Sequence, residues 1–459
     1  MIRGWMTNAA RLLPTAIAVG VLGTSLMMSS ALAQSCETNT VPVGANTTNP
    51  TAPFFINTQG LDLSTQPPTR NPNNPDYPPA TTLADGTLPP LYANGNFVLG
   101  PTHNPAPETV TNAKVPQGKL YTFNMTSTDS VIYNPGLIRD DPPPSANCRS
   151  IDVAATAPND PSYLFLTTSH PGTWTRTVTI YVPARHGFGN GNEMPLMVLG
   201  DGDILSFFVP IYTVFDNLIA ERKIPPMIVV AIGSGGQDAQ GAERGLEYDE
   251  VSGRYAEWVE REVLPKVEQT IGMRLTRDPD GRATMGISSS GAAAFSMAWF
   301  HPDLYNRVLA YSPTLVNQQW PHNTGLRGGA WEFHSPWAGP PGPNENIVGF
   351  GTPTPSTLPV ATPLVLQNPR KPIRAWYEVG DRDLFFPLPN MPDGMHDWTM
   401  ANEHMAKVLA AKGYQYQFVF SKNAGHVDGA TVAQTLPHAL QWVWEGYPNR
   451  RVDGGQHDW

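Results

Sequence analysis

Apolar residues fall into continuous runs, separated by amphipathic segments, across the second half of the chain. The runs within 194–203 and 225–236 each end in a glycine-rich turn. Unbroken runs of this kind are typical of strands buried on both faces of a parallel sheet, and the segments between them have helical periodicity. We expect strands within 194–203, 225–236, 281–287, 307–313, 371–383 and 414–426, and helices within 207–223, 252–272, 289–302, 396–413 and 429–446.

Two earlier segments alternate between apolar and polar residues. They span 117–130 and 174–184, and the second is rich in β-branched residues, which favours strands. With the strand–helix alternation that follows, this predicts an α/β protein with a doubly wound, mostly parallel sheet and an N-terminal β extension. Ligands of such sheets bind beyond the carboxyl ends of the strands.

The first 33 residues have the pattern of a secretory signal peptide. Arg3 and Arg11 precede an apolar stretch, and the small residues Ala31 and Ala33 frame a cleavage site. A membrane anchor is the alternative, but glycine and proline interrupt the stretch and no charged stop follows it. We therefore expect export to the periplasm or the cell exterior, with cleavage.

The rest of the chain divides by composition. Residues 34–117 are rich in proline, asparagine and threonine and have little periodicity, which predicts an extended, mostly irregular arm. We expect the catalytic domain at 118–449 and a short tail at 450–459.

One long loop interrupts the catalytic domain at 318–370. Loops of this length in compact domains are usually functional or disordered. This one carries Trp331 and Trp337 among glycines and prolines, so we expect an ordered flap whose aromatic side chains bind substrate. The alternative is a surface excursion whose tryptophans pack on the domain.

Charge and cysteine content narrow the class of protein. The formal net charge is −10, and removal of residues 1–33 would make it −12, which gives no reason to bind nucleic acid or an anionic membrane. The only cysteines are Cys36 and Cys148, and in an exported protein such a pair predicts a disulfide.

We expect neither a metal nor a cofactor. The chain has no His-Glu-x-x-His segment and no paired cysteine ligands. Its two Asp-Gly segments, at 201–203 and 278–281, do not continue to the distal glutamate of a calcium loop.

Three consecutive serines, Ser288 to Ser290, stand where a predicted strand meets a predicted helix. A nucleophilic serine on such an elbow needs small residues two positions before and two after it. Ser288 has Gly286 and Ser290 at those positions, so it is the predicted nucleophile, while Ser290 is sterically possible but would lie inside the helix. The backbone N–H of Ser289 is then a predicted oxyanion donor. The alternative is a serine cluster that only caps the helix.

Partners for this serine follow in the chain order of α/β hydrolases: serine, acid, histidine. Asp381 and Asp383 come directly after one predicted strand, and His426 comes after the next. A serine hydroxyl needs a base to remove its proton, and the histidine needs an acid to fix its tautomer. Either aspartate satisfies this pattern.

The segment 286–313 resembles the elbow region of the enterochelin-esterase and esterase-D type α/β hydrolases, including His301-Pro302 after the nucleophile. The resemblance covers about residues 119–447 and implies an α/β-hydrolase fold. It selects Asp383 as the acid, through the Gly-x-x-Asp pattern, and His426 as the base. It also implies oxyanion donors at Gly202 and Asp203, and substrate binding by Arg244 and Glu247 of the segment "ERGLEY". Ser290 departs from the family's glycine.

Together these observations predict an exported serine carboxylesterase acting on a small or polymeric ester. An acyltransferase with the same triad and a non-catalytic surface or carbohydrate-binding protein are the alternatives. The sequence leaves the substrate and the oligomeric state open.

Overall fold

The structure is a computed structural model that describes residues 54–57, 79–139, 164–167, 169–184, 193–236, 242–316, 329–335, 363–384 and 397–448. The expected signal peptide, both cysteines, Trp337 and the C-terminal tail lie outside these ranges. Most of the long loop also lies outside them.

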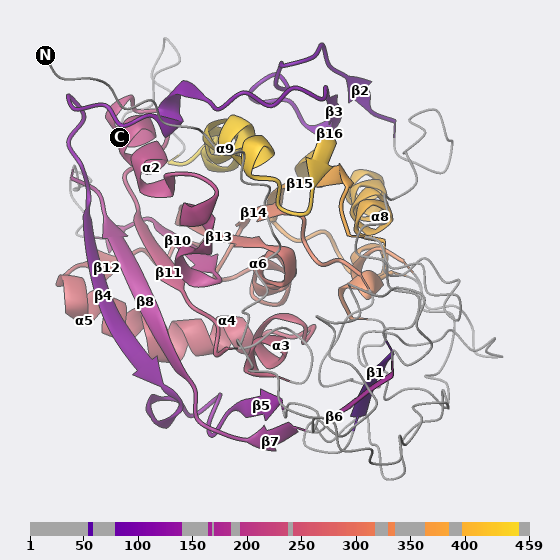
Figure 1. Ribbon diagram of the computed structural model, residues 1–459. Helices are drawn as coiled ribbons and strands as arrows, with labels where there is room; N and C mark the ends of the chain where they lie inside the picture. The colour runs from indigo at the N-terminus through magenta and orange to yellow at the C-terminus, as the bar shows by residue number, and fades with distance from the viewer. Residues whose placement is uncertain are drawn as a thin grey trace, which may run out of the picture.

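A ten-stranded sheet forms the centre of the molecule (Figure 1). Across the sheet the order is β2-β3-β16-β15-β14-β13-β10-β11-β8-β4. Neighbours from β2 to β11 are parallel, while β8 is antiparallel to β11 and β4 is antiparallel to β8. The strands are β2 (Thr81–Thr82), β3 (Gly95–Leu99), β4 (Lys119–Thr126), β8 (Thr175–Val182), β10 (Leu196–Gly200), β11 (Ile228–Ile232), β13 (Arg282–Ile287), β14 (Arg307–Tyr311), β15 (Arg374–Arg382) and β16 (Gln415–Gly425).

Helices cover both faces of this sheet, as the alternating pattern predicts. One face is covered by α2 (Ile211–Ala220) and α9 (Gly429–Trp444), and the other by α6 (Ser288–Phe300) and α8 (Trp398–Ala411), among others (Figure 1). The remaining described helices are α3 (Glu243–Tyr248), α4 (Arg254–Trp258), α5 (Leu264–Ile271) and α7 (Leu364–Gln367). Three two-stranded pairs complete the strands: β1 (Phe54–Asn57) with β6 (Leu164–Thr167), β5 (Leu137–Arg139) with β7 (Ser169–Pro171), and β9 (Glu193–Met194) with β12 (Arg274–Leu275).

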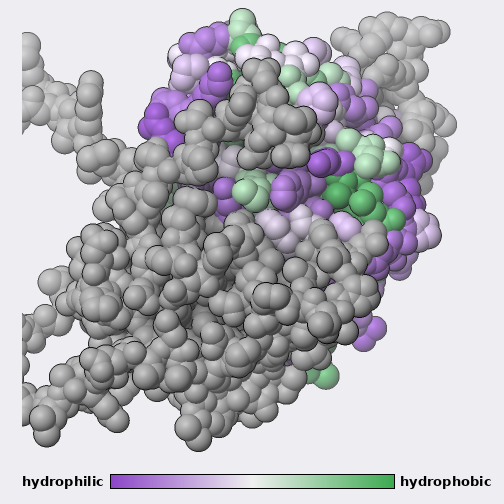
Figure 2. Space-filling view, turned by 90° about the vertical axis from the view of Figure 1, so that its right-hand side faces the viewer, coloured by the Kyte–Doolittle hydropathy of each residue, from purple (hydrophilic) through white to green (hydrophobic). Residues whose placement is uncertain are grey.

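The core divides into two apolar clusters because successive side chains of a strand point to opposite faces. In β10, Val198 belongs to one cluster, while Met197 and Leu199 belong to the other. Each fully buried side chain of this size contributes about 1.5–3 kcal/mol. The described surface in Figure 2 is mostly hydrophilic, with hydrophobic residues in small groups. Within the described ranges, no helix has both the length and the apolar character that a bilayer crossing requires.

Two short strands, β2 and β3, add regular structure to the segment expected to be a mostly irregular arm. They lie within the proline-rich segment, yet β3 pairs with β16 and extends the main sheet at its edge. The apolar run of β3 is only three residues long, Phe97 to Leu99, and is surrounded by turn-forming residues, so its pattern is too short to stand out. The strand forms because its backbone N–H and C=O groups bond to those of β16, which is distant in the sequence.

The helix expected at 252–272 is present but interrupted. A π-helical segment, Val259–Val263, separates α4 from α5. Pro265 follows it in the first turn of α5, and a proline cannot donate to the carbonyl one turn earlier and crowds it. The local widening accommodates that missing hydrogen bond.

Candidate active site

The turn between β13 and α6 holds Ser288 in a left-handed backbone conformation, with φ of 52°. This is rare for a residue with a side chain and is a feature of nucleophile elbows. The turn is tight: a Cβ on Gly286 would lie 2.2 Å from the carbonyl oxygen of Ser290. Glycine at 286 is therefore a steric requirement of the elbow.

Ser290 bonds to the backbone of the elbow from inside the helix. Its Oγ accepts a hydrogen bond from the backbone N–H of Ile287 at 2.9 Å and donates to the carbonyl of Ile287 at 2.8 Å. The residue is 1% exposed. Its hydroxyl is thus fully engaged with backbone, unlike that of Ser288.

Three side chains from three strand ends meet at the elbow. His426, directly after β16, lies with Nε2 2.9 Å from Ser288 Oγ and Nδ1 2.6 Å from Asp383 Oδ1. Because an ionised carboxylate only accepts hydrogen bonds, Nδ1 is the donor to Asp383. In the neutral ring, Nε2 is then free to accept the proton of Ser288. This arrangement can transfer a proton from the serine hydroxyl to the imidazole.

Asp383 and Asp381 have different surroundings. Asp383 is 1% exposed, and its Oδ1 also accepts from the N–H of Leu384 at 2.6 Å. Asp381 Oδ1 instead accepts from the backbone N–H of Ala424 at 3.2 Å, which ties β15 to β16. Asp383, which the resemblance selects as the acid, is thus the one of the two that lies within hydrogen-bond distance of His426 among the described contacts.

Sequence reasoning missed two residues that surround this group. Thr314, just after β14, donates its backbone N–H to the carbonyl of Ser288 at 2.9 Å, and its Oγ1 lies 3.3 Å from Ser288 Oγ. Trp398, the first residue of α8, packs edge-on against His426 with ring centres 6.0 Å apart. Thr314 lies at the carboxyl end of a parallel strand, so the position of a polar residue there was the available signal.

The loop after β10 contains the expected oxyanion donors. Asp201 and Gly202 both have left-handed backbone conformations, with φ of 60° and 61°, at the start of a 3₁₀ segment, Gly202–Phe207. This loop lies beside the elbow, because a Cβ on Gly200 would come within 2.6 Å of the Cβ of Ser290. The loop thus begins beside the first turn of α6, which carries Ser289 and Ser290.

Arg244 supports this loop, and substrate binding by the same side chain stays a prediction. Its Nε and Nη2 donate to the two carboxylate oxygens of Asp201, both at 2.9 Å. The N–H of Asp201 donates to Tyr248 Oη at 3.0 Å, and the Arg244 guanidinium lies 5.3 Å from the Tyr248 ring centre. Burial alone would lower the pKa of Arg244, but the Asp201 carboxylate outweighs it and the pKa is raised.

Glu247 is likewise inside the protein. Its carboxylate is fully buried and forms an ion pair with Arg176, whose guanidinium lies between the rings of Trp174 and Trp258 at 3.8 and 4.5 Å. Burial, followed by the nearby Glu247, raises the pKa of the adjacent Glu243 to about 8. The position of Glu247 argues against direct contact with a substrate.

Trp331 lies in the short described part of the long loop, in a 3₁₀ segment, Gly329–Phe333. It is 5% exposed and contacts the rings of His334 and His404 at 4.9 and 5.6 Å. Ser335 Oγ lies 3.0 Å from His334 Nδ1 and 2.9 Å from His404 Nδ1, which links the loop to α8. These contacts fit the packing alternative for Trp331.

Comparison with known proteins places this geometry in a family. A family model described as "Putative esterase" matches residues 169–442, more than half of the chain. The chain belongs to the esterase family. Its sheet and its elbow are those of an α/β-hydrolase fold. No curated protein matches the chain.

Several solved esterases have a similar structure. One is the enterobactin esterase FES from Shigella flexneri, at 20% identity and a TM-score of 0.38, covering 61% of this chain and 57% of that one. The chain thus spans little more than half the length of that esterase. A ferulic acid esterase from Anaeromyces mucronatus is 11% identical, with a TM-score of 0.42, and the similarity covers 75% of this chain and 97% of that one.

Proposed function

We propose that this esterase is an exported serine carboxylesterase in which Ser288 is the nucleophile, His426 the base and Asp383 the acid that orients it. The observation that carries the proposal is the pair of contacts of His426, 2.9 Å to Ser288 Oγ and 2.6 Å to Asp383 Oδ1. Support for the nucleophile also comes from the left-handed backbone at Ser288.

The chemistry proceeds in two halves. His426 Nε2 takes the proton of Ser288 as Oγ attacks the ester carbonyl carbon, and it returns that proton to the alcohol that leaves. Water then attacks the acyl-enzyme, giving its proton to His426, and the carboxylic acid departs as the proton returns to Ser288 Oγ. Asp383 keeps the Nδ1 proton in place and stabilises the imidazolium during both halves.

The developing oxyanion needs N–H donors near Ser288. We assign the backbone N–H of Ser289, with a second donor from the Gly202–Asp203 backbone. Each such donor is worth about 3–4 kcal/mol in the transition state. Arg244 then acts as a positioning residue, because it fixes Asp201 at the start of the second donor segment. Trp337 and the rest of the long loop would line the substrate pocket.

The proposal is tested with Ser288→Ala and Ser290→Ala on a simple aryl ester. Ser288→Ala should abolish hydrolysis and also labelling by a fluorophosphonate probe. Ser290→Ala should keep most of the activity, because its hydroxyl bonds only to the backbone of Ile287. An active, labelled Ser288→Ala variant would rule out this nucleophile. Transfer of the acyl group to an added alcohol in preference to water would indicate an acyltransferase.

A further inference from the structure

A cavity of about 880 Å³ opens at the edge of the sheet opposite the candidate active site. Its walls include the first residues of β14, β15 and β16, whereas Ser288, Asp383 and His426 follow the last residues of their strands. The nine residues of β15 are eight steps of about 3.3 Å, which separates the two edges by roughly 26 Å. The cavity is therefore a separate feature, and its volume falls in the range of small-molecule sites.

Cations dominate this cavity although the protein as a whole is acidic. Four of the lining residues are basic and two are acidic: Arg307, Arg370, Lys371 and Arg374 against Asp280 and Glu445. A chain with a formal net charge of −10 does not produce such an excess through its average composition. The excess is a local property of this edge.

The two carboxylates are already engaged. Arg374 Nη2 lies 2.5 Å from Glu445 Oε2, and Arg307 Nη2 lies 3.3 Å from Asp280 Oδ1. A guanidinium has five N–H groups, and three of those of Arg374 have bonds within the described part of the chain, to Trp442, Gln415 and Glu445. The two carboxylates thus balance the charges of Arg307 and Arg374. Arg370 and Lys371 have no carboxylate partner among the lining residues.

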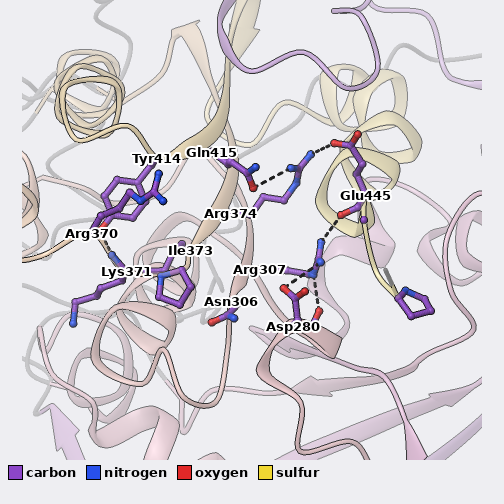
Figure 3. Close-up of a pocket in the computed structure, with 13 residues that line it drawn as sticks. Asp280, Asn306, Arg307, Arg370, Lys371, Ile373, Arg374, Tyr414, Gln415 and Glu445 are labelled. Carbon is purple, nitrogen blue, oxygen red and sulfur yellow. Dashed lines mark hydrogen bonds and ion pairs between the residues drawn. The ribbon is translucent and has the colours of Figure 1, made fainter. Parts of the chain in front are cut away.

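Figure 3 shows two cationic groups on opposite sides of the cavity. Arg307 and Arg374 lie together with the acids on one side, and Arg370 and Lys371 lie beside Tyr414 on the other, with Asn306 and Ile373 between them. Arg370 is anchored by a hydrogen bond from Nη1 to the carbonyl of Gly413 at 2.7 Å. Lys371 Nζ lies 4.7 Å from the ring centre of Trp299.

Three of these cations have unfavourable surroundings for their charge. Burial lowers the pKa of Lys371 and of Arg374, and it lowers the pKa of Arg307 to about 10, with nearby Arg374 adding to the effect. A bound anion would reverse this, because an opposite charge within a few ångströms favours the charged form of each base. A ligand with more than one negative group would stabilise the charged forms of several of these bases at once.

We propose that this cavity binds a small multivalent anion with two or more phosphate or carboxylate groups. One group would lie against Arg370 and Lys371, and the other would reach the spare N–H groups of Arg374. Arginine forks suit both phosphate and carboxylate oxygens, so the shared chemistry of the ligand is its spaced anionic oxygens.

The test uses tripolyphosphate and citrate as probes, added to the full chain at constant ionic strength and followed by calorimetry and thermal unfolding. We expect saturable binding with a Kd below about 1 mM and a matching rise in Tm. The double variant Arg370→Ala/Lys371→Ala should weaken binding about tenfold or more. These side chains lie at the rim, so the fold should tolerate the change.

The matched control is Arg261→Ala/Arg274→Ala, which removes two cations that are 71% and 73% exposed and do not line the cavity. It should keep the wild-type Kd. Equal weakening in both double variants, equal effects of acetate and citrate, or no saturable binding up to about 10 mM would overturn the proposal. Aryl ester hydrolysis should be unchanged in both double variants, so the result is independent of the triad assignment.

Discussion

At the scale of single residues, two aspartates that are two positions apart have separate tasks. Asp383 faces His426 Nδ1, whereas Asp381 accepts a hydrogen bond from the backbone of Ala424. We expect Asp383→Asn to lower kcat on an aryl ester by about 10⁴-fold, because an amide would stabilise the wrong tautomer of His426. Asp381→Asn should stay within a few-fold of wild type. Comparable losses in both variants would contradict the assignment of the acid.

A third aspartate, Asp397, makes the stability of the fold depend on pH. It caps α8, accepting from the N–H of Met400 at 2.9 Å, and is 4% exposed. Burial raises its pKa from 3.8 to about 6, and the charge of Asp383 adds to this. The folded protein therefore holds the proton more tightly than the unfolded chain. Stability from this group is present below pH 3.8 and is lost as the pH rises towards 6.

Asp397→Asn should remove that loss. An asparagine still caps the helix, so we expect the variant to be more stable than wild type at pH 7, by on the order of 2–3 kcal/mol, and nearly equal at pH 3.5. Urea unfolding at pH values from 3.5 to 7 measures the difference. The control is Asp278→Asn, at an exposed residue that caps the short 3₁₀ segment Pro279–Gly281. A stability difference that does not change with pH would show that burial of this charge is unimportant.

At the scale of elements, the loop after β10 depends on side chains from α3. Arg244→Ala would leave the Asp201 carboxylate unpaired at a position with φ of 60°. We expect kcat to fall by about 10- to 100-fold with little change in KM, because a misplaced donor weakens the transition state more than substrate binding. The control is Arg277→Ala, which removes an arginine that is 58% exposed. A rise in KM at constant kcat would instead support substrate binding by Arg244.

The elements differ in how far the sequence predicts them. The strands that precede Ser288, Asp383 and His426 were predictable, because a strand buried on both faces has an unbroken apolar run and the functional residue follows directly. The strand β3 was not, since its run is short and its stability comes from pairing with the distant β16. The roles of Arg244 and Glu247 were not predictable either, because their partners, Asp201 and Arg176, are far along the chain.

At the scale of the whole molecule, the sheet separates two sites with different side-chain chemistry. Its carboxyl edge brings together the candidate triad, and its amino edge carries the cation-rich cavity. In a parallel sheet the two edges are joined by rigid, fully buried strands. Ligands at the two edges can therefore be studied with separate variants, and binding at one edge contributes to the stability of the whole fold through mass action.

The expected disulfide between Cys36 and Cys148 is also a property of the whole chain, although both residues lie outside the described ranges. If residues 1–33 direct export, the protein matures in an oxidising compartment, where a lone cysteine pair usually forms a bridge. Such a bridge would close a loop of more than a hundred residues and restrict the unfolded chain, which is worth about 3–5 kcal/mol.

Intact mass of the exported protein decides this. Without a reductant, we expect a mass lower by two hydrogen atoms and no reaction with an alkylating agent; after reduction under denaturing conditions, two adducts should form. The double variant Cys36→Ser/Cys148→Ser should unfold at a lower temperature than the oxidised protein and at the same temperature as the reduced one. Because the cysteines are far from Ser288 in the sequence and belong to no part of the triad, aryl ester hydrolysis well below that temperature should be unchanged. Two alkylated thiols in the unreduced protein would show that the arm is not tied to the catalytic domain in this way.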